Sequence, residues 1–374
     1  ALAPQSPRPY CGATYTARRA RASKAMTSDI KQRKADHLDL CATDDVAFRD
    51  RTTLLECVRL VHQSLPEVAF DSIDTTTQIL GKELRAPIVI AAMTGGHERA
   101  AEINRALASV AEGRGYAFGL GSQRAMQKRP DTSWTYQVRD DAPNVLLFGN
   151  VGVVQARDMS TDEIAKMVTD VGADALCVHM NPAMELVQPE GDRDFTRGLD
   201  TFRRLHAELE VPVIAKETGN GVSRHTAARL FGVGVRHVDT SGAGGTSWVG
   251  VETMRADGTS RAIGEALWDW GVPTAASVVY CVEAGLTTIA TGGIRTGSDV
   301  ARAIALGADC AGLARVVYQA FLDGGTDGAG RFLDGVEQEL RSIMLLCGAR
   351  SIAELKRAPR IVIGELRDWT RERA

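Results

Sequence analysis

Residues 173–185 read Ala173-Asp-Ala-Leu-Cys-Val-His-Met-Asn-Pro-Ala-Met-Glu185. The apolar run that opens this stretch predicts a buried strand of a parallel sheet. His179 and Asn181 are two residues apart, so an extended chain directs both side chains the same way. Glu185 follows after a proline. An imidazole, an amide and a carboxylate therefore gather at the carboxyl end of one strand, where α/β barrels place their chemistry. The alternative is a strand end whose polar groups only cap it.

Seven further apolar runs of this kind lie between residues 87 and 313, and a helical segment with Ala/Leu periodicity follows each. Strand–helix alternation predicts a parallel sheet with right-handed crossovers, and eight units predict a closed (β/α)8 TIM barrel of the α/β class. An open doubly wound sheet normally carries Gly-x-Gly-x-x-Gly after its first strand, which the turn at residues 93–96 does not match. The predicted strands are Pro87–Ala92, Ala117–Gly119, Val145–Asn150, Ala175–Met180, Pro212–Lys216, His237–Thr240, Thr288–Thr291 and Cys310–Leu313.

Segments flank this barrel on both sides. Residues 1–26 are Arg-rich and hold no Asp or Glu, so we expect a disordered tail, either an upstream extension or a transit peptide. Residues 27–374 are expected to form one domain. In it, a helix–loop–helix extension over 27–80 precedes the barrel, and closing helices follow from residue 330.

A long gap separates the sixth and seventh predicted strands, at residues 241–287. This insertion falls on the catalytic face of the barrel. Its tryptophans Trp248, Trp268 and Trp270 either help to form a lid or are ordinary surface and core aromatics.

The composition narrows the class of protein. The 374 residues are 44% hydrophobic and 24% charged, with a net charge of -3. No aromatic-and-basic array suggests nucleic acid, and no apolar run is long enough to span a bilayer. The seven cysteines are scattered, odd in number and lack a Cys-x-x-Cys pair. We therefore expect reduced, buried thiols in a cytoplasmic enzyme.

Glycines follow the last two predicted strands. Gly292-Gly293 and Arg295 follow the seventh strand and open a helix, and Ala314-Arg315 follow the eighth. These two loops form the common phosphate site of barrels, where backbone N–H groups and a helix N-terminus meet the anion. The alternative is that the glycines only permit tight turns with positive φ.

Other strand ends carry small or polar residues that suit a planar cofactor across the barrel mouth. Lys216 ends the fifth strand, and a lysine beside a flavin pyrimidine edge stabilises the negative charge of the reduced form. The alternative for Lys216 is a Schiff base of the aldolase type, which needs no flavin. The other residues of this pattern are Ala92, Met93, Thr94, Ser122, Asn150 and Thr246.

A second anion site is indicated by Arg33, Lys34, His37 and Arg124, because several cationic groups and a bidentate arginine suit a diphosphate. For the Arg33-Lys34 pair alone, a solvated helix face is the simpler interpretation. Glu185 could hold Mg²⁺ against such a diphosphate, since Mg²⁺ usually takes one or two carboxylates plus substrate oxygens. The nearby acids Glu190, Asp192 and Asp194 are expected to serve loop structure and pairing with Arg193.

At this point the motifs match a known family. From about residue 33 to 369 the chain resembles type 2 isopentenyl diphosphate isomerase, an FMN-dependent enzyme of isoprenoid biosynthesis. The motifs are specific in combination. They are Arg33-Lys34-x-x-His37, Leu65-Pro66-Glu67, Ala91-Ala-Met93-Thr94-Gly95-Gly96, Gly121-Ser122-Gln123-Arg124, His179-x-Asn181, Pro189-Glu190-Gly191-Asp192-Arg193, Lys216-Glu217, Ser241-Gly-Ala-Gly-Gly245-Thr246-Ser247-Trp248 and Gly292-Gly293-Ile-Arg-Thr-Gly297.

The resemblance implies a TIM barrel with FMN, Mg²⁺, a prenyl diphosphate substrate, a flavin reductant (NADPH or a reductase) and a homotetramer or homo-octamer. It implies an allylic proton shift without net redox change, in which reduced FMN protonates the alkene. It assigns catalysis to His179, Asn181, the position of Met184, and Glu185, which also binds the metal. It assigns FMN contacts to Ala92, Met93, Thr94, Ser122, Asn150, Lys216, Thr246, Gly292, Gly293, Arg295, Ala314 and Arg315. It assigns substrate contacts to Arg33, Lys34, His37, Arg124, Ser223, Arg224 and Trp248.

One position departs from the family pattern. The family has glutamine directly before the metal-binding glutamate, where this chain has Met184. A thioether has no transferable proton and is at best a weak acceptor, but it is apolar and polarizable. Gln188 lies four positions later and cannot be assumed to substitute.

Two functions follow within this fold. The first is isomerisation of isopentenyl to dimethylallyl diphosphate. The second is a repurposed member that protonates a longer prenyl substrate and cyclises it, which Met184 favours. From other classes, a 2-hydroxy-acid oxidase would need an Arg/His pair on the late strands, and an inosine monophosphate dehydrogenase-like barrel a loop cysteine. Neither is evident, since Cys281 lies in a helical stretch. A non-catalytic FMN-binding scaffold would leave His179, Asn181 and Glu185 without a purpose.

Overall fold

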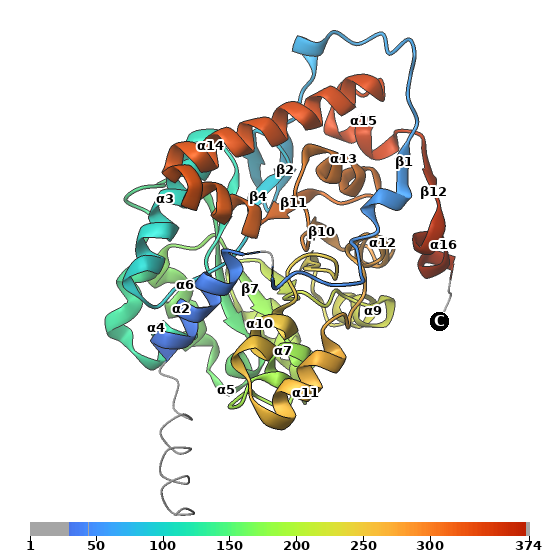
Figure 1. Cartoon of the computed structure of the whole chain (residues 1–374). Helices are drawn as coiled ribbons and strands as arrows, with labels where there is room; N and C mark the ends of the chain where they lie inside the picture. Colours follow the sequence, from blue (N-terminus) through green and yellow to red (C-terminus); the bar gives the residue numbers. More distant parts are fainter. Residues whose placement is uncertain (1–29, 44, 372–374) are drawn as a thin grey trace, which may run out of the picture.

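The computed structural model describes residues 30–43 and 45–371 (Figure 1), so the expected tail 1–26 lies outside the described residues. Eight parallel strands close into a barrel, each paired with the next in chain order and the last with the first. This confirms the (β/α)8 TIM barrel, with every strand within two residues of its expected position. The strands are β4 (Ile88–Ile90), β5 (Ala117–Gly119), β6 (Leu146–Gly152), β7 (Ala175–His179), β8 (Val213–Lys216), β9 (His237–Asp239), β10 (Thr287–Ala290) and β11 (Cys310–Leu313).

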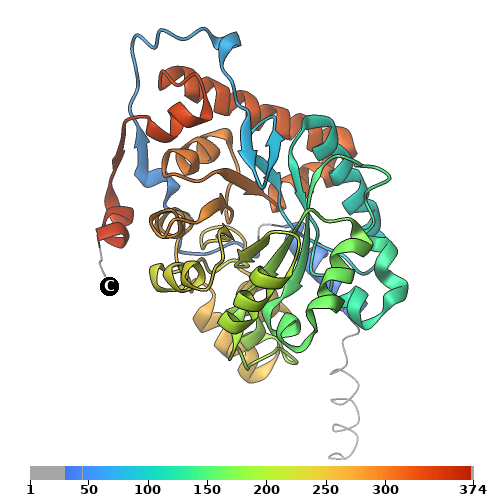
Figure 2. The same ribbon diagram turned by 180° about the vertical axis from the view of Figure 1, so that it is seen from behind.

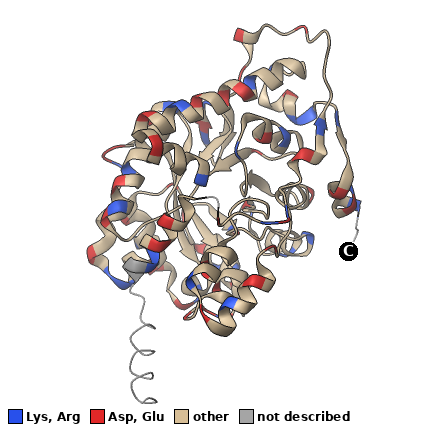
Figure 3. Ribbon diagram, viewed as in Figure 1, with Lys and Arg blue, Asp and Glu red and all other residues tan. Residues whose placement is uncertain are grey.

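Helices cover the outside of the barrel, and local sequence signals fix their ends. Helix α6 begins with a capping box of Ser160 and Glu163 and ends at Gly172, whose φ is 64°. Figure 3 shows acidic and basic residues interspersed along these outer helices, as the net charge of -3 would suggest. The outer helices are α3 (Glu98–Arg114), α6 (Thr161–Val171), α8 (Gly198–Glu208), α9 (Arg224–Gly232), α12 (Thr274–Glu283), α13 (Gly297–Ala305) and α14 (Arg315–Leu346).

Short helices occupy the loops at the carboxyl ends of the strands. After β5, helix α4 (Arg124–Lys128) and the 3-10 helix η3 (Pro130–Tyr136) stand where a long barrel helix would be expected. Helix α5 (Val153–Asp158) follows β6 directly, and α7 (Pro182–Val187) follows β7. Side chains in these first turns therefore lie close to the barrel mouth.

The core has two layers, because alternate strand residues face opposite ways. Val89, Phe148 and Ile214 fill the barrel interior, whereas their neighbours pack against the surrounding helices. The hairpin of β2 (Thr77–Ile79) and β3 (Lys82–Leu84) adds two more side chains, Ile79 and Leu84, to the interior layer. Figure 2 shows this hairpin against the barrel strands in the view from behind.

The expected helix–loop–helix over 27–80 is half correct. Helix α2 (Ile30–Cys41) is present, but the expected second helix is wrong. Val58–Leu60 form strand β1 instead, which pairs antiparallel with β12 (Arg360–Val362) near the other end of the chain. Long-range pairing decides this segment, because Val58 is buried on the pleated surface that β12 completes.

The insertion and the closing helices complete the molecule. Helices α10 (Trp248–Arg255) and α11 (Gly258–Leu267) form the insertion after β9 and pack on α7. Helix α14 kinks at Gly324 and Gly325, and Gly348 follows it at φ 68°, as expected of a helix C-terminus. Helices α15 (Ile352–Arg357) and α16 (Gly364–Arg371) follow. Among the helices described for this chain, none combines the length and the apolar character needed to cross a membrane.

Candidate functional site

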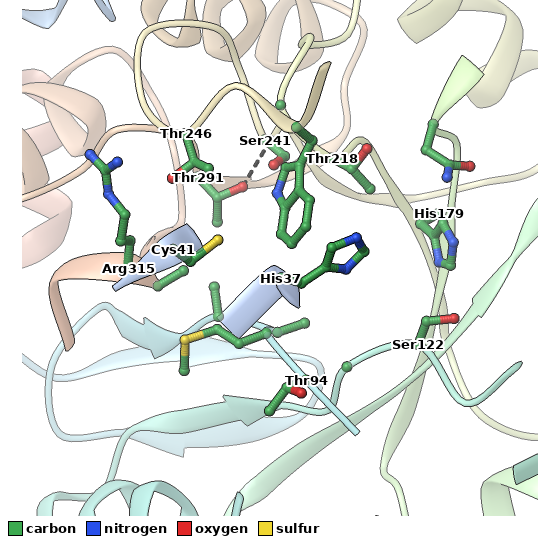
Figure 4. A pocket seen from close by; sticks show the side chains of 18 of the residues that line it. His37, Cys41, Thr94, Ser122, His179, Thr218, Ser241, Thr246, Thr291 and Arg315 are labelled. Carbon is green, nitrogen blue, oxygen red and sulfur yellow. Dashed lines mark hydrogen bonds between the residues drawn. The ribbon is translucent and has the colours of Figure 1, made fainter. Parts of the chain in front are cut away.

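One pocket opens at the carboxyl ends of the barrel strands (Figure 4), with a volume of about 1570 Å³ including its open mouth. Residues at or just beyond the ends of all eight strands line it, and helix α2 closes one side. The lining therefore extends across the whole mouth of the barrel, from α2 to the end of every strand.

The pocket gathers nearly every residue that the sequence singled out. Ser223 and Arg224 are the exceptions. Ser223 caps helix α9 by accepting from the Thr226 amide, and Arg224 pairs with Glu283 and stacks on Tyr280. The residues that line the pocket are Arg33, Lys34, His37, Ala92, Met93, Thr94, Ser122, Arg124, Asn150, His179, Asn181, Met184, Glu185, Lys216, Thr246, Trp248, Gly292, Gly293, Arg295, Ala314 and Arg315.

The imidazole of His179 is held in its neutral form. Burial, with the cations Lys34 and Lys216 nearby, lowers the His179 pKa to about 3. Its Nδ1 lies 2.8 Å from Asn150 Oδ1, and Asn150 Nδ2 donates to the Leu120 carbonyl at 3.0 Å. Because the Asn150 oxygen can only accept, the proton of His179 sits on Nδ1. Nε2 is then left with a lone pair.

Lys216 is paired rather than free. Its Nζ lies 2.8 Å from Asp239 Oδ2, and both side chains are buried. Asp239 in turn accepts from the Thr291 hydroxyl, which itself accepts from the Ser241 amide at 2.8 Å (Figure 4). The Asp239 carboxylate therefore engages the Lys216 amine directly. This arrangement favours an electrostatic role over a Schiff base, which would need a neutral amine.

Three cationic side chains that line the pocket, Arg33, Lys34 and Arg124, form a cluster. Burial, with Arg124 nearby, lowers the Arg33 pKa, and burial together with the two arginines lowers the Lys34 pKa to about 7. The Nε atoms of both arginines are buried and have no hydrogen-bond partner among the residues that the structure describes. Buried cations without enough acceptors indicate a site for an oxygen-rich anion.

A buried network fixes helix α2 to the insertion. His37 Nε2 lies 2.7 Å from Glu252 Oε1, and Arg255 donates to the other oxygen at 2.7 Å and to Asp36 at 3.0 Å. The ring of His37 meets that of Trp248 edge to face, with centroids 5.2 Å apart. We call these five residues the α2 latch. It holds the cation cluster of α2 over the pocket.

The other two insertion tryptophans have different environments. Trp268 is buried, its Nε1 donates to the Ala47 carbonyl, and Arg49 stacks on its ring at 3.7 Å. Trp270 is 65% exposed. Only Trp248 lines the pocket, so the lid interpretation holds for it alone.

The glycine-rich loops pack against each other at the opposite wall. A Cβ on Gly245 would lie 2.3 Å from the Gly293 nitrogen, and one on Gly292 would lie 2.2 Å from the Gly242 carbonyl oxygen. Gly292 also has a φ of 98°, which favours glycine. Side chains are therefore excluded here, and the main chain itself forms a cradle at the pocket wall.

The helix that begins beside this cradle is α14, and not α13 as the sequence suggested. The sequence suggested α13, but its first turn is already capped by Thr296 and Asp299, and the amides of Gly297 and Ser298 donate to Glu339. Helix α14 begins instead at the pocket, where Ala314, Arg315 and Val316 line the wall. Its N-terminal dipole faces the cradle and suits a phosphate group.

These features fit FMN. The cradle and the start of α14 suit its phosphate, Lys216 suits the anionic edge of a reduced flavin, and the buried Thr94 hydroxyl has no partner among the described residues. The described residues offer fewer protein ligands for Mg²⁺. In the described chain no three His, Cys, Asp or Glu side chains cluster, so Glu185 would be the one carboxylate beside substrate oxygens and waters.

Glu185 is held by its own loop. Asn181 Nδ2 donates to Oε1 at 2.9 Å, and the Asp192 amide donates to Oε2 at 2.8 Å. Met184 is half-buried at the pocket wall, with its sulfur 4.0 Å from Asn181 Nδ2. Gln188, one helical turn later, lines the same pocket and is 4% exposed.

Several residues of the site were missed from the sequence. Asp239 ends β9 and could have been noticed as a carboxylate at a strand end. Gln155 and Glu252 carried no signal, because each acts through a partner on a distant element. Asp192 bonds Gln155 and Arg124 rather than the expected Arg193.

Comparisons with solved structures show the fold. A mandelate oxidase variant with an FMN adduct superposes with a TM-score of 0.61 at 18% identity, covering 92% of this chain and 99% of that one. A variant of flavocytochrome b2 with benzoylformate gives 0.61 at 21% identity, covering 84% and 78%. The described pocket has no Arg/His pair on its late strands of the kind a 2-hydroxy-acid oxidase needs, because its histidines are His37 and His179.

Comparisons of sequence show the family. The model of the FMN-dependent dehydrogenase family matches residues 26–184 and 153–361. Isopentenyl-diphosphate delta-isomerase of Methanothermobacter thermautotrophicus is 42% identical over 346 residues, which cover 92% of this chain and 97% of that protein. The protein of the same name from Pyrococcus abyssi is 42% identical over 351 residues, which cover 91% and 95%. The chain therefore belongs to the FMN-dependent dehydrogenase family and, within it, to the type 2 isopentenyl-diphosphate delta-isomerases.

Proposed function

We propose that the protein isomerises isopentenyl diphosphate to dimethylallyl diphosphate without net redox change and with reduced FMN. One observation carries this proposal: a single pocket joins a cluster of buried cations to a glycine cradle with a helix N-terminus. Two separate anion sites in one cavity suit a phosphate-bearing cofactor beside a diphosphate substrate. The relatives named isopentenyl-diphosphate delta-isomerase support the same reaction.

The cation cluster would bind the diphosphate. Arg33 and Arg124 offer forked donors to its oxygens, and Lys34 adds a point charge. Glu185 would hold Mg²⁺, which would supply positive charge against the diphosphate. The bound diphosphate would leave the prenyl chain in the less polar centre of the pocket, near Met93 and Met184.

The strand ends would set the proton chemistry. When bound, reduced FMN supplies an acid close to the alkene. Lys216, kept charged by Asp239, would balance the negative charge of the reduced ring. His179 offers a lone pair on Nε2 and has a pKa of about 3, so it would act as a neutral hydrogen-bonding group beside the substrate. It would not add a further positive charge there.

A second candidate function is supported by Met184. An apolar, polarizable thioether at the pocket wall tolerates a carbocation or a longer chain better than a glutamine does. In this alternative the protein protonates a longer prenyl diphosphate, and a second double bond attacks the cation, which closes a ring and moves the positive charge to a new carbon. Loss of a proton from a neighbouring carbon then gives a neutral alkene. The cation cluster and the glycine cradle would serve both reactions.

The remaining expectations belong to this proposal. Residues 27–374 would act as one FMN-binding unit, reduced by NADPH or a reductase and assembled as a homotetramer or homo-octamer. The six cysteines of the described chain are free thiols, which supports a cytoplasmic location. Light scattering coupled to gel filtration tests the assembly, and a monomer would contradict it.

A product assay tests the function. The protein, loaded with FMN and Mg²⁺ and reduced, is supplied separately with isopentenyl, geranyl, farnesyl and geranylgeranyl diphosphate. Conversion of the five-carbon substrate supports the isomerase. A cyclic product from a longer chain, with no five-carbon turnover, supports the alternative. The Met184→Gln variant is the companion, since it should restore or raise five-carbon turnover at least tenfold if the thioether limits proton transfer. No turnover of any substrate would overturn both.

A further inference from the structure

We propose that Asp192 is a positioning residue, whose carboxylate holds Arg124 within the cation cluster while its backbone holds Glu185. This inference rests on the proposed function, because it concerns how the pocket meets a diphosphate. The two residues that Asp192 joins have different expected tasks, anion binding for Arg124 and metal binding for Glu185. One loop residue would therefore set the distance between them.

The contacts of Asp192 converge from three elements. Its Oδ2 accepts from Gln155 Nε2 of helix α5 at 2.6 Å, and Arg124 Nη1 of helix α4 lies 3.4 Å from the same oxygen. Its backbone N–H donates to Glu185 Oε2 of helix α7 at 2.8 Å. Arg124, Gln155 and Glu185 all line the pocket. Asp192 thus lies behind the pocket wall and contacts three of its residues.

A tight turn brings Asp192 to this position. The Gly191 amide donates to the Gln188 carbonyl at 3.0 Å, which reverses the chain after α7. A Cβ on Gly191 would lie 1.9 Å from the Glu185 carbonyl oxygen, so no side chain fits at this point. The turn therefore brings the backbone N–H of Asp192, rather than the N–H of a neighbouring residue, to the Glu185 carboxylate.

Gln155 supports the same carboxylate from the other side. A Cβ on Gly152 would lie 1.9 Å from Gln155 Oε1 and 3.1 Å from His179 Nε2, so the amide folds back over a bare main chain. Because its Nε2 donates to Asp192, its oxygen faces the side of His179. The orientation of Asp192 is thereby fixed independently of Arg124.

Arg124 needs such a partner because its other neighbours repel it. Its charge lowers the pKa values of both Arg33 and Lys34, its side chain is only 17% exposed, and Arg33 is itself mostly buried. Without an acceptor, a long arginine side chain next to two cations would turn toward water. Asp192 keeps the guanidinium in the cluster before the substrate arrives, and such preorganisation raises affinity.

A different role for Asp192 predicts the opposite change in anion affinity when the side chain is removed. If Asp192 contributed only its negative charge, its removal would raise the positive potential of the cluster and tighten anion binding. If it positions Arg124, its removal weakens anion binding. The affinity for a small anion therefore separates the two views.

Calorimetric titration of the FMN-loaded protein with inorganic pyrophosphate at fixed Mg²⁺ makes the test. Asp192→Ala should weaken pyrophosphate binding about tenfold, the size expected for a lost charge-assisted contact. Asp192→Asn keeps an acceptor oxygen and should stay within about threefold of the wild type. Asp194→Ala is the matched control, because Asp194 is exposed and pairs with Arg157, outside the pocket. Its affinity should not change.

Two further readouts exclude a merely structural role. In an Arg124→Ala background, Asp192→Ala should cause no further loss, because its partner is already gone. With substrate, Asp192→Ala should raise KM about tenfold and leave kcat within about threefold, since the backbone N–H to Glu185 remains. If Asp192→Ala fails to retain FMN or to fold, Asp192→Ser and Asp192→Asn replace it. Serine is too short to reach both partners, so it should bind more weakly than asparagine.

The outcomes are distinct. Unchanged or tighter pyrophosphate binding by Asp192→Ala, or an equal loss in the Arg124→Ala background, overturns the positioning role. Wild-type protein that binds pyrophosphate but turns over no prenyl diphosphate overturns the proposed function alone. Wild-type protein that binds no pyrophosphate overturns both.

Discussion

Lys34 has the most unusual charge state in the pocket, because it is buried with two arginines beside it. Its pKa of about 7 lies far below that of an exposed lysine, so it loses its proton as the pH rises through neutrality. A bound anion favours the charged form. Above pH 7, Lys34 must therefore take up a proton when an anion binds, so the affinity for the anion depends on pH.

The first prediction concerns this coupling. Pyrophosphate affinity should fall by up to about tenfold per pH unit above pH 7 in the wild type, relative to Lys34→Gln, which has no proton to take up. Calorimetry between pH 6.5 and 8.5 measures it, and the difference between the proteins cancels the titration of pyrophosphate itself. Parallel pH profiles for the two proteins would contradict the assigned Lys34 pKa.

Lys34 also affects folding, with a sign that follows from the same shift. Between pH 7 and the unfolded pKa near 10.5, the unfolded chain binds more protons at this lysine than the folded chain. The stability of the ligand-free protein should therefore rise across that window, and the contribution should vanish in Lys34→Gln. Urea unfolding at pH 7 and pH 9 checks this second prediction. Equal stability changes in the wild type and Lys34→Gln would show that the amine keeps its proton throughout this range.

Sequence alone reached many of these residues, for a physical reason. His179 ends one strand with Asn181 two residues beyond it, and Lys216 ends another, so the barrel geometry brings them together without further information. The hydrogen-bond partners of the site residues were harder to predict from the sequence. Glu252 is 215 residues from His37, and no pattern local to either residue announces the contact.

Among the elements, the two glycine loops and the start of α14 carry the cofactor hypothesis. At Gly245 the two loops touch, because a Cβ there would lie 2.3 Å from the backbone nitrogen of Gly293. A methyl group there would push the loops apart.

The third prediction follows. Gly245→Ala should weaken FMN binding at least tenfold, as measured by flavin fluorescence on titration of the apoprotein. Gly335→Ala is the control, since no atom lies within 4 Å of its Cβ position in helix α14. That variant should bind FMN normally and gain about 0.4–1 kcal/mol of stability. Equal FMN affinity in both variants would refute the cradle.

The α2 latch provides a fourth prediction. Glu252 is fully buried and accepts from both His37 and Arg255, so Glu252→Gln removes a buried negative charge that two side chains contact. We expect a loss of about 3–5 kcal/mol in the free energy of unfolding. Glu265→Gln, which breaks the exposed pair with Arg49, should change it by less than about 1 kcal/mol. Denaturant titrations compare the two, and similar values would show that the latch adds little.

The elements also mark where sequence reasoning failed. The α13 sequence has the glycine and capping residues of an anion-binding helix, yet Glu339 from α14 already occupies its N-terminal amides. Strand β1 looked helical because its partner β12 lies some three hundred residues away. A local sequence pattern does not show that a distant residue occupies a helix N-terminus or that a distant strand pairs with a segment.

At the scale of the whole molecule, the segment that precedes the barrel meets the C-terminal part of the described chain at β1 and β12. Strand β12 completes a sheet with β1, and Tyr280 donates to the Trp369 carbonyl at 2.6 Å. The last helix, α16, is anchored by one fully buried residue, Leu366. The C-terminal segment thus secures the region that leads into the barrel.

The fifth prediction tests that role. Leu366→Ala should lower the free energy of unfolding by about 2–5 kcal/mol, as expected for a truncated core residue. Ile361→Ala, which removes a side chain that is 57% exposed on β12, should change it by less than about 1 kcal/mol. Thermal denaturation of both variants gives the comparison, and a small effect at Leu366 would mean that α16 folds independently.

The α2 latch has a consequence for timing. Helix α2 closes over a pocket whose other walls are the rigid ends of the barrel. A molecule seated beneath α2 would leave more easily when that helix moves away. Because α2 also carries Arg33 and Lys34, the same movement would withdraw contacts from a bound diphosphate. Loosening the latch should therefore speed release more than it speeds uptake.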